Sequence, residues 1–141
     1  MSSVCLRPTE DLETVRELHA LAFPDAPWVG DGHAFWLATQ GGAAVGFCSA
    51  VFYERLGCVF LSRAAVMNSA AGVGLQRRMI RTRVAWARTL IGCNRVVTYC
   101  APRNYSSLVN LLKCGFRFYE PTKEGKDAWG VAGAHYFRLP L

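Results

Sequence analysis

The chain has 141 residues, about half of them apolar, and a formal net charge of +6 at pH 7. This length fits one compact domain, and the apolar content can supply a buried core, which excludes a disordered chain. The sequence contains no run of about 18 apolar residues, which excludes a transmembrane helix. Its first residues also lack the basic and apolar regions of a secretory signal.

Hydrophobic period and turn residues predict one order of elements along the chain. In chain order we expect a strand at 4–7, a helix at 9–22, strands at 34–39, 43–53 and 58–67, a helix at 74–91, a strand at 95–100, a helix at 105–114, and strands at 116–120 and 135–139. Gln40-Gly41-Gly42 indicates a hairpin between two of these strands. Strand–helix–strand connections after residue 58 imply some parallel pairing, and hairpins imply antiparallel pairing, so we expect a mixed α/β fold.

The six cysteines are dispersed along the chain and form no CxxC pair. A chain with this much core does not need a disulfide framework, and the spacing of a zinc site is absent. We therefore expect reduced, mostly buried thiols, no metal and a cytoplasmic location.

Charged residues are unevenly distributed. Six of the ten acidic residues lie in the first 31 positions, whereas 55–117 contains eleven Lys or Arg and no Asp or Glu. Arg77, Arg81 and Arg88 share one face of the helix predicted at 74–91, at about 100° per residue. This basic region favours an anionic ligand, and three alternatives stay open: nucleic acid, a phosphorylated cofactor, or a solvated surface.

A glycine turn joins a strand to a helix in 66-VMNSAAGVGLQRRMI-80. The first N–H groups of a helix have no partner within the helix and, together with the helix dipole, favour phosphate. Glycines permit unusual φ angles and a close approach of the backbone to a ligand. Neither a Walker loop nor a GxGxxG fingerprint is present, so we predict a phosphate cradle of another kind, with a plain helix-start turn as the alternative.

A second strand–helix segment follows in 96-VVTYCAPRNYSSLVNLLKCGF-116. Asn104 is a good N-cap for the short helix. Gly115 is expected to end that helix in a left-handed conformation, and Phe116 to begin a core strand. These structural roles do not explain why two such segments follow one another.

The two segments together resemble the acyl-CoA motifs of the GNAT superfamily of N-acyltransferases. The first is similar to V-x-P-x-x-Q/R-x-x-G-x-G/A, with Val66 and Gly74 at matching places. The second is similar to N-x-x-A-x-x-x-Y-x-K-x-G-F, with matches at Asn104, Lys113 and Gly115-Phe116. The resemblance implies a single domain over 1–141 with a central, mixed, mostly antiparallel twisted sheet flanked by helices. It also implies transfer of an acyl group, most often acetyl from acetyl-CoA, to an amine by direct attack.

The resemblance further implies a set of cofactor-binding residues. They are Ala65, Val66, Met67, Ala71, Gly72, Val73, Gly74, Leu75, Gln76, Arg77, Asn104 and Ser107. Two places depart from the family. Ala71 replaces a polar residue that helps to hold the pyrophosphate, and Leu111 replaces the tyrosine that protonates the CoA thiolate in many relatives. We expect the backbone amides of 72–76 to hold the pyrophosphate, with Arg77 beside them.

Deprotonation of the amine is the harder chemical demand. The family places a carboxylate base at one of two positions, which are Phe60 and Tyr99 here. A Lys amine, with a pKa of about 10.4, costs roughly 4.6 kcal/mol to neutralise at pH 7, whereas an α-amine with a pKa near 8 costs about 1.4 kcal/mol. We therefore expect a weakly basic acceptor or a base that acts through water.

The candidate catalytic residues are Tyr99 and Tyr105, with Glu54 or His33 as further members of a water relay. Each also has a structural interpretation. Tyr99 closes a strand with its ring in the core, Tyr105 packs at a helix start, and His33 is solvated in a glycine-rich loop. Glu54 is a turn carboxylate that pairs with its neighbour Arg55.

The acceptor amine is not identified by the sequence. One alternative is a nucleic-acid-associated GNAT protein that modifies a base or nucleotide amine, supported by the basic region. Another is a GNAT-fold protein that binds CoA without catalysis, because Ala71 and Leu111 both depart from the pattern. The resemblance also implies a homodimer as one oligomeric state, because such domains often pair through sheet edges.

Overall fold

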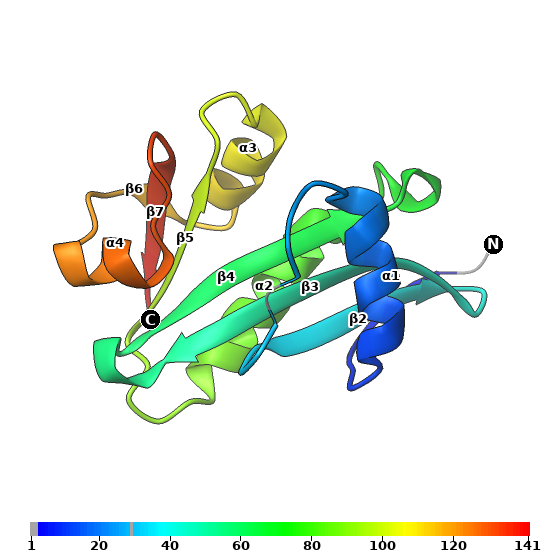
Figure 1. The fold of residues 1–141 in the computed structure, drawn as a ribbon, viewed down its shortest axis with the longest axis horizontal. Helices are drawn as coiled ribbons and strands as arrows, with labels where there is room; N and C mark the ends of the chain where they lie inside the picture. Colours follow the sequence, from blue (N-terminus) through cyan, green and yellow to red (C-terminus); the bar gives the residue numbers. More distant parts are fainter. Residues whose placement is uncertain (1–2, 29) are drawn as a thin grey trace. The chain divides into compact units, whose positions relative to one another are not determined.

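A computed structural model describes residues 3–28 and 30–141. The chain divides into two compact units, one comprising Met1–Val51 and Ser62–Met79 and the other Phe52–Leu61 and Ile80–Leu141. Seven strands form one sheet in the order β1-β2-β3-β4-β5-β7-β6, and the fold is the predicted mixed α/β class (Figure 1). None of the helices in the described part of the chain is both long and apolar enough to cross a membrane.

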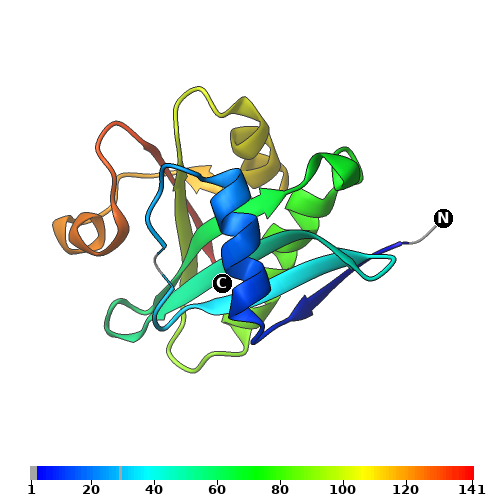
Figure 2. The same cartoon turned by 45° about the vertical axis from the view of Figure 1, so that its right-hand side comes forward.

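The first unit contains an antiparallel sheet built on a hairpin. β1 (Val4–Pro8) pairs with β2 (Ala34–Gln40), and β2 pairs with β3 (Ala43–Tyr53), as Figure 2 shows. Gly41 and Gly42 connect β2 to β3 with φ angles of 58° and 82°. A two-residue hairpin loop of this kind requires positive φ at both positions, which explains why the predicted hairpin forms there.

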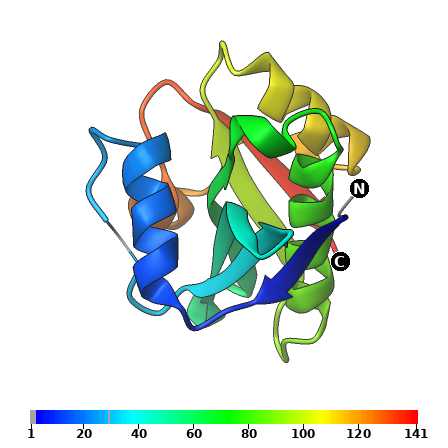
Figure 3. The same cartoon turned by 90° about the vertical axis from the view of Figure 1, so that its right-hand side faces the viewer.

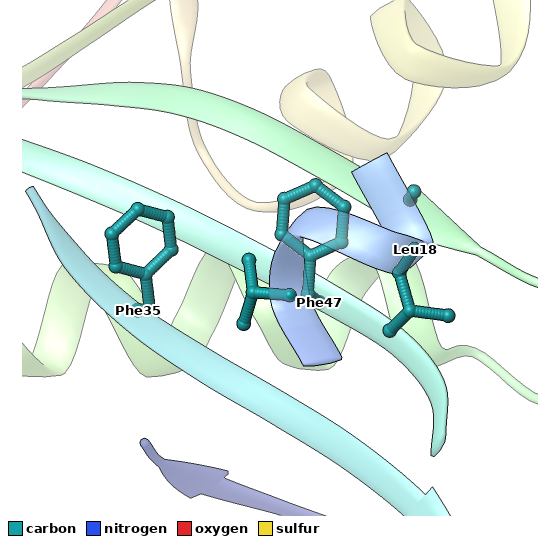
Figure 4. Close-up of a cluster of buried hydrophobic side chains, with 5 residues drawn as sticks. Leu18, Phe35 and Phe47 are labelled. Carbon is teal, nitrogen blue, oxygen red and sulfur yellow. The ribbon is translucent and has the colours of Figure 1, made fainter. Parts of the chain in front are cut away.

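Helix α1 (Leu12–Ala22) packs on one face of this hairpin (Figure 3). It begins three residues later than predicted because Asp11, and not an earlier residue, caps it by accepting a hydrogen bond from the Thr14 amide at 3.2 Å. Its apolar stripe, including Val15 and Leu18, forms a core cluster with Phe35, Phe47 and Ala65 (Figure 4). The helix therefore packs on the strands because each presents a row of apolar side chains at its own period, and the two rows bury each other.

Gly46 lies at a crowded point of β3. Phe47 faces α1, so Gly46 faces the opposite side of the sheet, where a Cβ would lie 2.6 Å from the Ala65 carbonyl oxygen and 3.1 Å from Met79 Cε. We expect Gly46→Ala to lower the free energy of unfolding by about 1–3 kcal/mol, as overpacked cores do. Urea unfolding measures the loss. Ala43→Ser, at the exposed start of the same strand, should leave stability unchanged.

The second unit contains the only parallel pairing among the strand pairs described. The first residues of β4 (Cys58–Val66) run parallel to β5 (Arg95–Cys100), with Cys58 opposite Arg95. β5 is antiparallel to β7 (His135–Pro140), which is antiparallel to β6 (Arg117–Phe118). The predicted crossover after residue 58 is therefore confirmed.

The remaining helices differ in part from expectation. α2 (Leu75–Arg88) and α3 (Tyr105–Lys113) lie within their predicted ranges. α4 (Lys123–Trp129) was not predicted, because seven residues that include a glycine show no clear helical period. It is fixed instead by Thr122, whose hydroxyl caps it, and by the buried Trp129, which stacks on Phe60.

Two further boundaries are corrections. The strand predicted at 116–120 is reduced to the two residues of β6, and the Phe116 amide instead donates to the Leu111 carbonyl oxygen at the end of α3. The helix predicted to reach Ile91 ends at Arg88, and Ile91 is 96% exposed. A single exposed isoleucine at helical spacing was misleading, because spacing alone does not show that a residue is buried.

Candidate functional site

The glycine turn lies in the first unit, between the end of β4 and the start of α2. A single 3₁₀ turn, η2 (Asn68–Ala70), follows Met67. Gly72 and Gly74 have φ angles of 81° and 76°, and nothing lies within 4 Å of the position that a Cβ would occupy on either. Residues 71–74 are exposed. The turn thus presents an open, side-chain-poor backbone at the positive start of a 14-residue helix.

The two basic residues near the start of α2 differ in their surroundings. Arg77 is partly buried. Arg78 donates from Nη1 to the Val4 carbonyl oxygen at 2.8 Å and so links α2 to β1 within the first unit. Arg77 stays the residue predicted to lie beside a phosphate.

A groove of about 390 Å³ lies beside the end of β4. Its walls are residues 21–23 at the end of α1 and 64–68 of β4 and the following loop. Three predicted cofactor residues, Ala65, Val66 and Met67, are among them. The Met67 amide donates to the Val45 carbonyl oxygen at 2.8 Å. It is therefore already satisfied, and polarisation of a bound carbonyl would fall to another backbone amide of the groove.

The remaining predicted residues, Tyr99, Asn104, Tyr105 and Ser107, lie in the second unit. Asn104 caps α3, since its Oδ1 accepts a hydrogen bond from the Ser107 amide at 3.2 Å. Leu111 is 3% exposed and belongs to the core. Its apolar character therefore has a packing reason.

The two candidate tyrosines have contrasting surroundings. Tyr99 is partly buried on β5, with its ring stacked on Phe60 at 5.6 Å and edge-on to Tyr136 at 6.4 Å. Tyr105 is 70% exposed, so the expectation that it packs is wrong. It is the first residue of α3, and its side chain points into solvent because the apolar stripe of that helix begins one turn later.

A polar chain in the first unit was not found from the sequence. His33 Nδ1 lies 3.1 Å from Ser62 Oγ, which lies 2.6 Å from Ser49 Oγ, and Ser49 Oγ accepts a hydrogen bond from the Arg63 amide at 3.0 Å. His33 is half-buried, so the expectation of a solvated histidine is wrong. Burial lowers the pKa of His33, and this outweighs the opposing effect of Asp31. The imidazole is therefore neutral at pH 7, as a proton acceptor must be.

Glu54 does not pair with Arg55 as expected. Arg55 forms an exposed ion pair with Glu124 at 2.8 Å, and Glu54 begins the 3₁₀ turn η1 (Glu54–Leu56). Glu54 thus keeps the role of a turn carboxylate.

The basic region is not one continuous face. Arg81 and Arg88 are exposed, as a solvated face requires, but Arg83 on the same helix is 3% exposed. Arg95 donates to the Leu56 carbonyl oxygen at 2.9 Å. Part of the positive charge therefore serves local structure, which was not visible from the count of basic residues.

A family model described as the Acetyltransferase (GNAT) family matches residues 5–116. The chain belongs to this family, and the resemblance noted in the two motif segments is confirmed. None of the proteins with curated functions matches the chain significantly in sequence.

Solved structures show the same fold. An IAA acetyltransferase from Bacillus cereus ATCC 14579 is 19% identical over 99% of this chain and 100% of that chain, with a TM-score of 0.79. A GNAT family acetyltransferase from Elizabethkingia anophelis with acetyl-CoA bound is 15% identical over 98% of each chain, with a TM-score of 0.77. Naa50 from Arabidopsis thaliana, in complex with the bisubstrate analogue CoA-Ac-MVNAL, is 14% identical over 99% of each chain, with a TM-score of 0.77.

Proposed function

We propose that the protein is an acetyl-CoA-dependent N-acetyltransferase whose single domain spans 1–141 and which transfers acetyl to an amine by direct attack. The observation that carries this proposal is the open glycine turn at the start of α2, continuous in sequence with a groove at the end of β4. A phosphate cradle followed by a groove lined by exposed backbone and apolar side chains suits a ligand with a pyrophosphate at one end and an acyl chain at the other. The acetyl-CoA bound to the Elizabethkingia relative supports this choice of ligand.

In this proposal the cofactor is held mainly by backbone. The amides of 72–76 hold the pyrophosphate and Arg77 contributes charge, which offsets the missing side chain of Ala71. Ala65, Val66 and Met67 flank the pantetheine and the acetyl group. Asn104 and Ser107 stay predicted contacts of the pantetheine arm, as the family motif implies. A cytoplasmic location is part of this proposal, because a reducing compartment keeps cysteines in the thiol form that all six have here.

The reaction needs the amine to lose a proton and the thiolate to leave. We propose that His33 accepts the proton, directly or through one water, because it is neutral and is oriented by Ser62. The CoA thiolate has a pKa near 8.5 and needs little help from an acid. The buried Leu111 is therefore compatible with turnover, and the exposed hydroxyl of Tyr105 is the candidate donor.

Tyr99 and Tyr105 can be tested by removing only their hydroxyl groups. Tyr99→Phe keeps the ring that stacks on Phe60, and Tyr105→Phe keeps the helix start. We expect Tyr105→Phe to lower kcat by about tenfold or less, because the leaving group is already acidic, and Tyr99→Phe to have a smaller effect. Rates of thiol release between pH 6 and 9 measure both. Turnover of Tyr99→Phe that is unchanged at every pH would exclude that hydroxyl from the reaction.

The proposed function is tested by titration of the folded protein with acetyl-CoA in a calorimeter, followed by thiol release with a panel of amines. We expect saturable binding, and thiol release that depends on an amine. No binding at millimolar acetyl-CoA would overturn the proposal. Binding without turnover on any amine would favour the alternative of a CoA-binding protein without catalysis.

A nucleic-acid acceptor is the other class that the basic region suggests. Phosphate contacts give an affinity that falls steeply with salt. Because Arg78, Arg83 and Arg95 are engaged or buried within the protein, we expect only weak binding of duplex DNA at physiological salt. Tight, salt-sensitive binding in a fluorescence anisotropy titration would favour a nucleic-acid-associated acetyltransferase.

A further inference from the structure

Arg63 on β4 lies next to both the polar chain of His33 and the groove. It follows Ser62, the partner of His33, and precedes Ala64, the first β4 residue of the groove. Its guanidinium carbon lies 4.9 Å from the centre of the Phe23 ring, and Phe23 itself lines the groove. All of these residues belong to the first unit. A cation is therefore held between the polar chain at His33 and the groove at the end of β4.

The charge of Arg63 is not balanced by a carboxylate in the described part of the chain. The ion pairs found there are Arg55–Glu124 and Lys126–Glu120, both exposed. Arg63 is partly buried, and a partly buried cation without a counter-ion is unfavourable. The positive charge of Arg63 also affects the buried His19. Burial is the larger cause that lowers the pKa of His19, and the charge of Arg63 is the second. The site would thus be stabilised by an anion.

Stacking on Phe23 leaves Arg63 suited to a carboxylate. A guanidinium that lies on an aromatic face keeps its N–H groups along the edge of its plane, where they match the two oxygens of a carboxylate. The ring also restricts the side chain, so that less entropy is lost on binding. Lysine has neither the planar fork nor the stacking surface.

The direction of β4 indicates which substrate Arg63 serves. The glycine turn follows the groove in the chain, whereas Arg63 precedes it, about 10 Å before Val66 at 3.3 Å per residue. If the pyrophosphate lies at the turn and the acetyl group in the groove, as the proposed function requires, Arg63 lies beyond the acetyl group and away from the phosphates. That is the side from which an acceptor must approach.

We propose that Arg63 binds a carboxylate of the acceptor, so that the substrates of this enzyme are small amines that carry a carboxylate, such as amino acids and dipeptides. His33, anchored one residue away at Ser62, then lies near the amine of the same molecule. Arg63 is a binding residue that orients the acceptor and takes no part in proton transfer. This inference rests on the proposed function and specifies its acceptor.

The test compares acceptors that differ only in their charge. Dipeptides with a free carboxylate are each paired with the corresponding dipeptide amide, and thiol release from acetyl-CoA is measured. In a dipeptide the α-amine has a pKa near 8 with either end group, so amine basicity is nearly constant across each pair. We expect kcat/KM to be at least about tenfold higher for the carboxylate member, as a charge-assisted bidentate contact requires.

Three variants assign the preference to Arg63. Arg63→Gln should lower kcat/KM about 10–100-fold for carboxylates and less than about threefold for amides, with acetyl-CoA affinity unchanged. Arg63→Lys should keep only part of the preference for carboxylates, because lysine lacks the planar group that can donate two hydrogen bonds to one carboxylate. Arg16→Gln is the matched control, since Arg16 also lies over an aromatic ring, 5.1 Å from the centre of Trp28, but is exposed on α1. It should keep the full preference.

Several outcomes would overturn the inference. They are equal rates for carboxylates and amides in the wild type, an equal loss on both classes in Arg63→Gln, or a preference lost equally in Arg16→Gln. A panel in which no carboxylate is acetylated, and none raises the Tm of the acetyl-CoA-loaded protein, would also overturn it. Failure of the proposed function is distinct, because acetyl-CoA itself would then not bind.

Discussion

Gly74→Val is expected to raise the Kd for acetyl-CoA by about 30-fold or more. Gly74 has a φ of 76°, which a β-branched residue does not adopt without strain, so the turn before α2 must rearrange. Rearrangement turns at least one amide away from the pyrophosphate, and a hydrogen bond to a charged group contributes about 1.5–3 kcal/mol. Calorimetric titration of wild type and variant measures the change.

The strain itself must be separated from the loss of the cradle. Gly133 also has a φ of 76° and open space where a Cβ would lie, but it belongs to the loop before β7. Gly133→Val should therefore lower stability by a similar amount, about 1–2 kcal/mol, while acetyl-CoA affinity stays unchanged. Equal loss of affinity in both variants, or in neither, would contradict a cradle at the glycine turn.

His33→Gln is expected to lower kcat/KM about 100-fold at pH 7.5, on an acceptor found in the amine panel. This is the ordinary contribution of a positioned general base. A base works only when neutral, so wild-type activity should fall as the pH falls through the pKa of His33. Burial places that pKa below the ordinary value of about 6.5. The acidic limb of the pH–rate profile should accordingly lie below pH 6.5 and should be absent from the variant.

Two variants show whether this effect is specific. Ser62→Ala removes the hydroxyl that orients the imidazole, at 3.1 Å from Nδ1, and should give a smaller loss with the acidic limb still present. His135→Gln changes an exposed histidine on β7 and should have no effect on either rate or profile. An unaltered acidic limb in His33→Gln would show that another group accepts the proton.

Local signals in the chain predicted most of the elements. Hydrophobic period located α2 and the long strands, and short-range chemistry located the ends of several of them. Asn104 caps α3, and Gly115 takes a φ of 94° directly after that helix, both as expected. Such features depend on residues within one turn of each other, which is why they can be read from a single sequence.

Features that depend on distant residues were not predicted. α4 is held by the burial of Trp129 against Phe60 and Tyr53, which lie about 70 residues earlier in the chain. His33 contacts Ser62 across 29 residues, and Ser62 contacts Ser49 across 13. No pattern along the chain predicts these contacts, because they form only when separate strands and loops pack together.

The sequence by itself determined the family and located the glycine turn that we propose as the phosphate cradle, because glycines, a helix start and two spaced motifs are local properties of the chain. The tertiary structure decided which side chains surround the groove. Arg63, His33 and Phe23 belong to no motif, and the roles that we propose for them depend on contacts that β4 makes with a loop histidine and with the end of α1. Burial then lowers the pKa of one side chain and leaves the charge of another without a carboxylate partner among the described residues. Those electrostatic properties come from packing, and packing is specified by the whole fold.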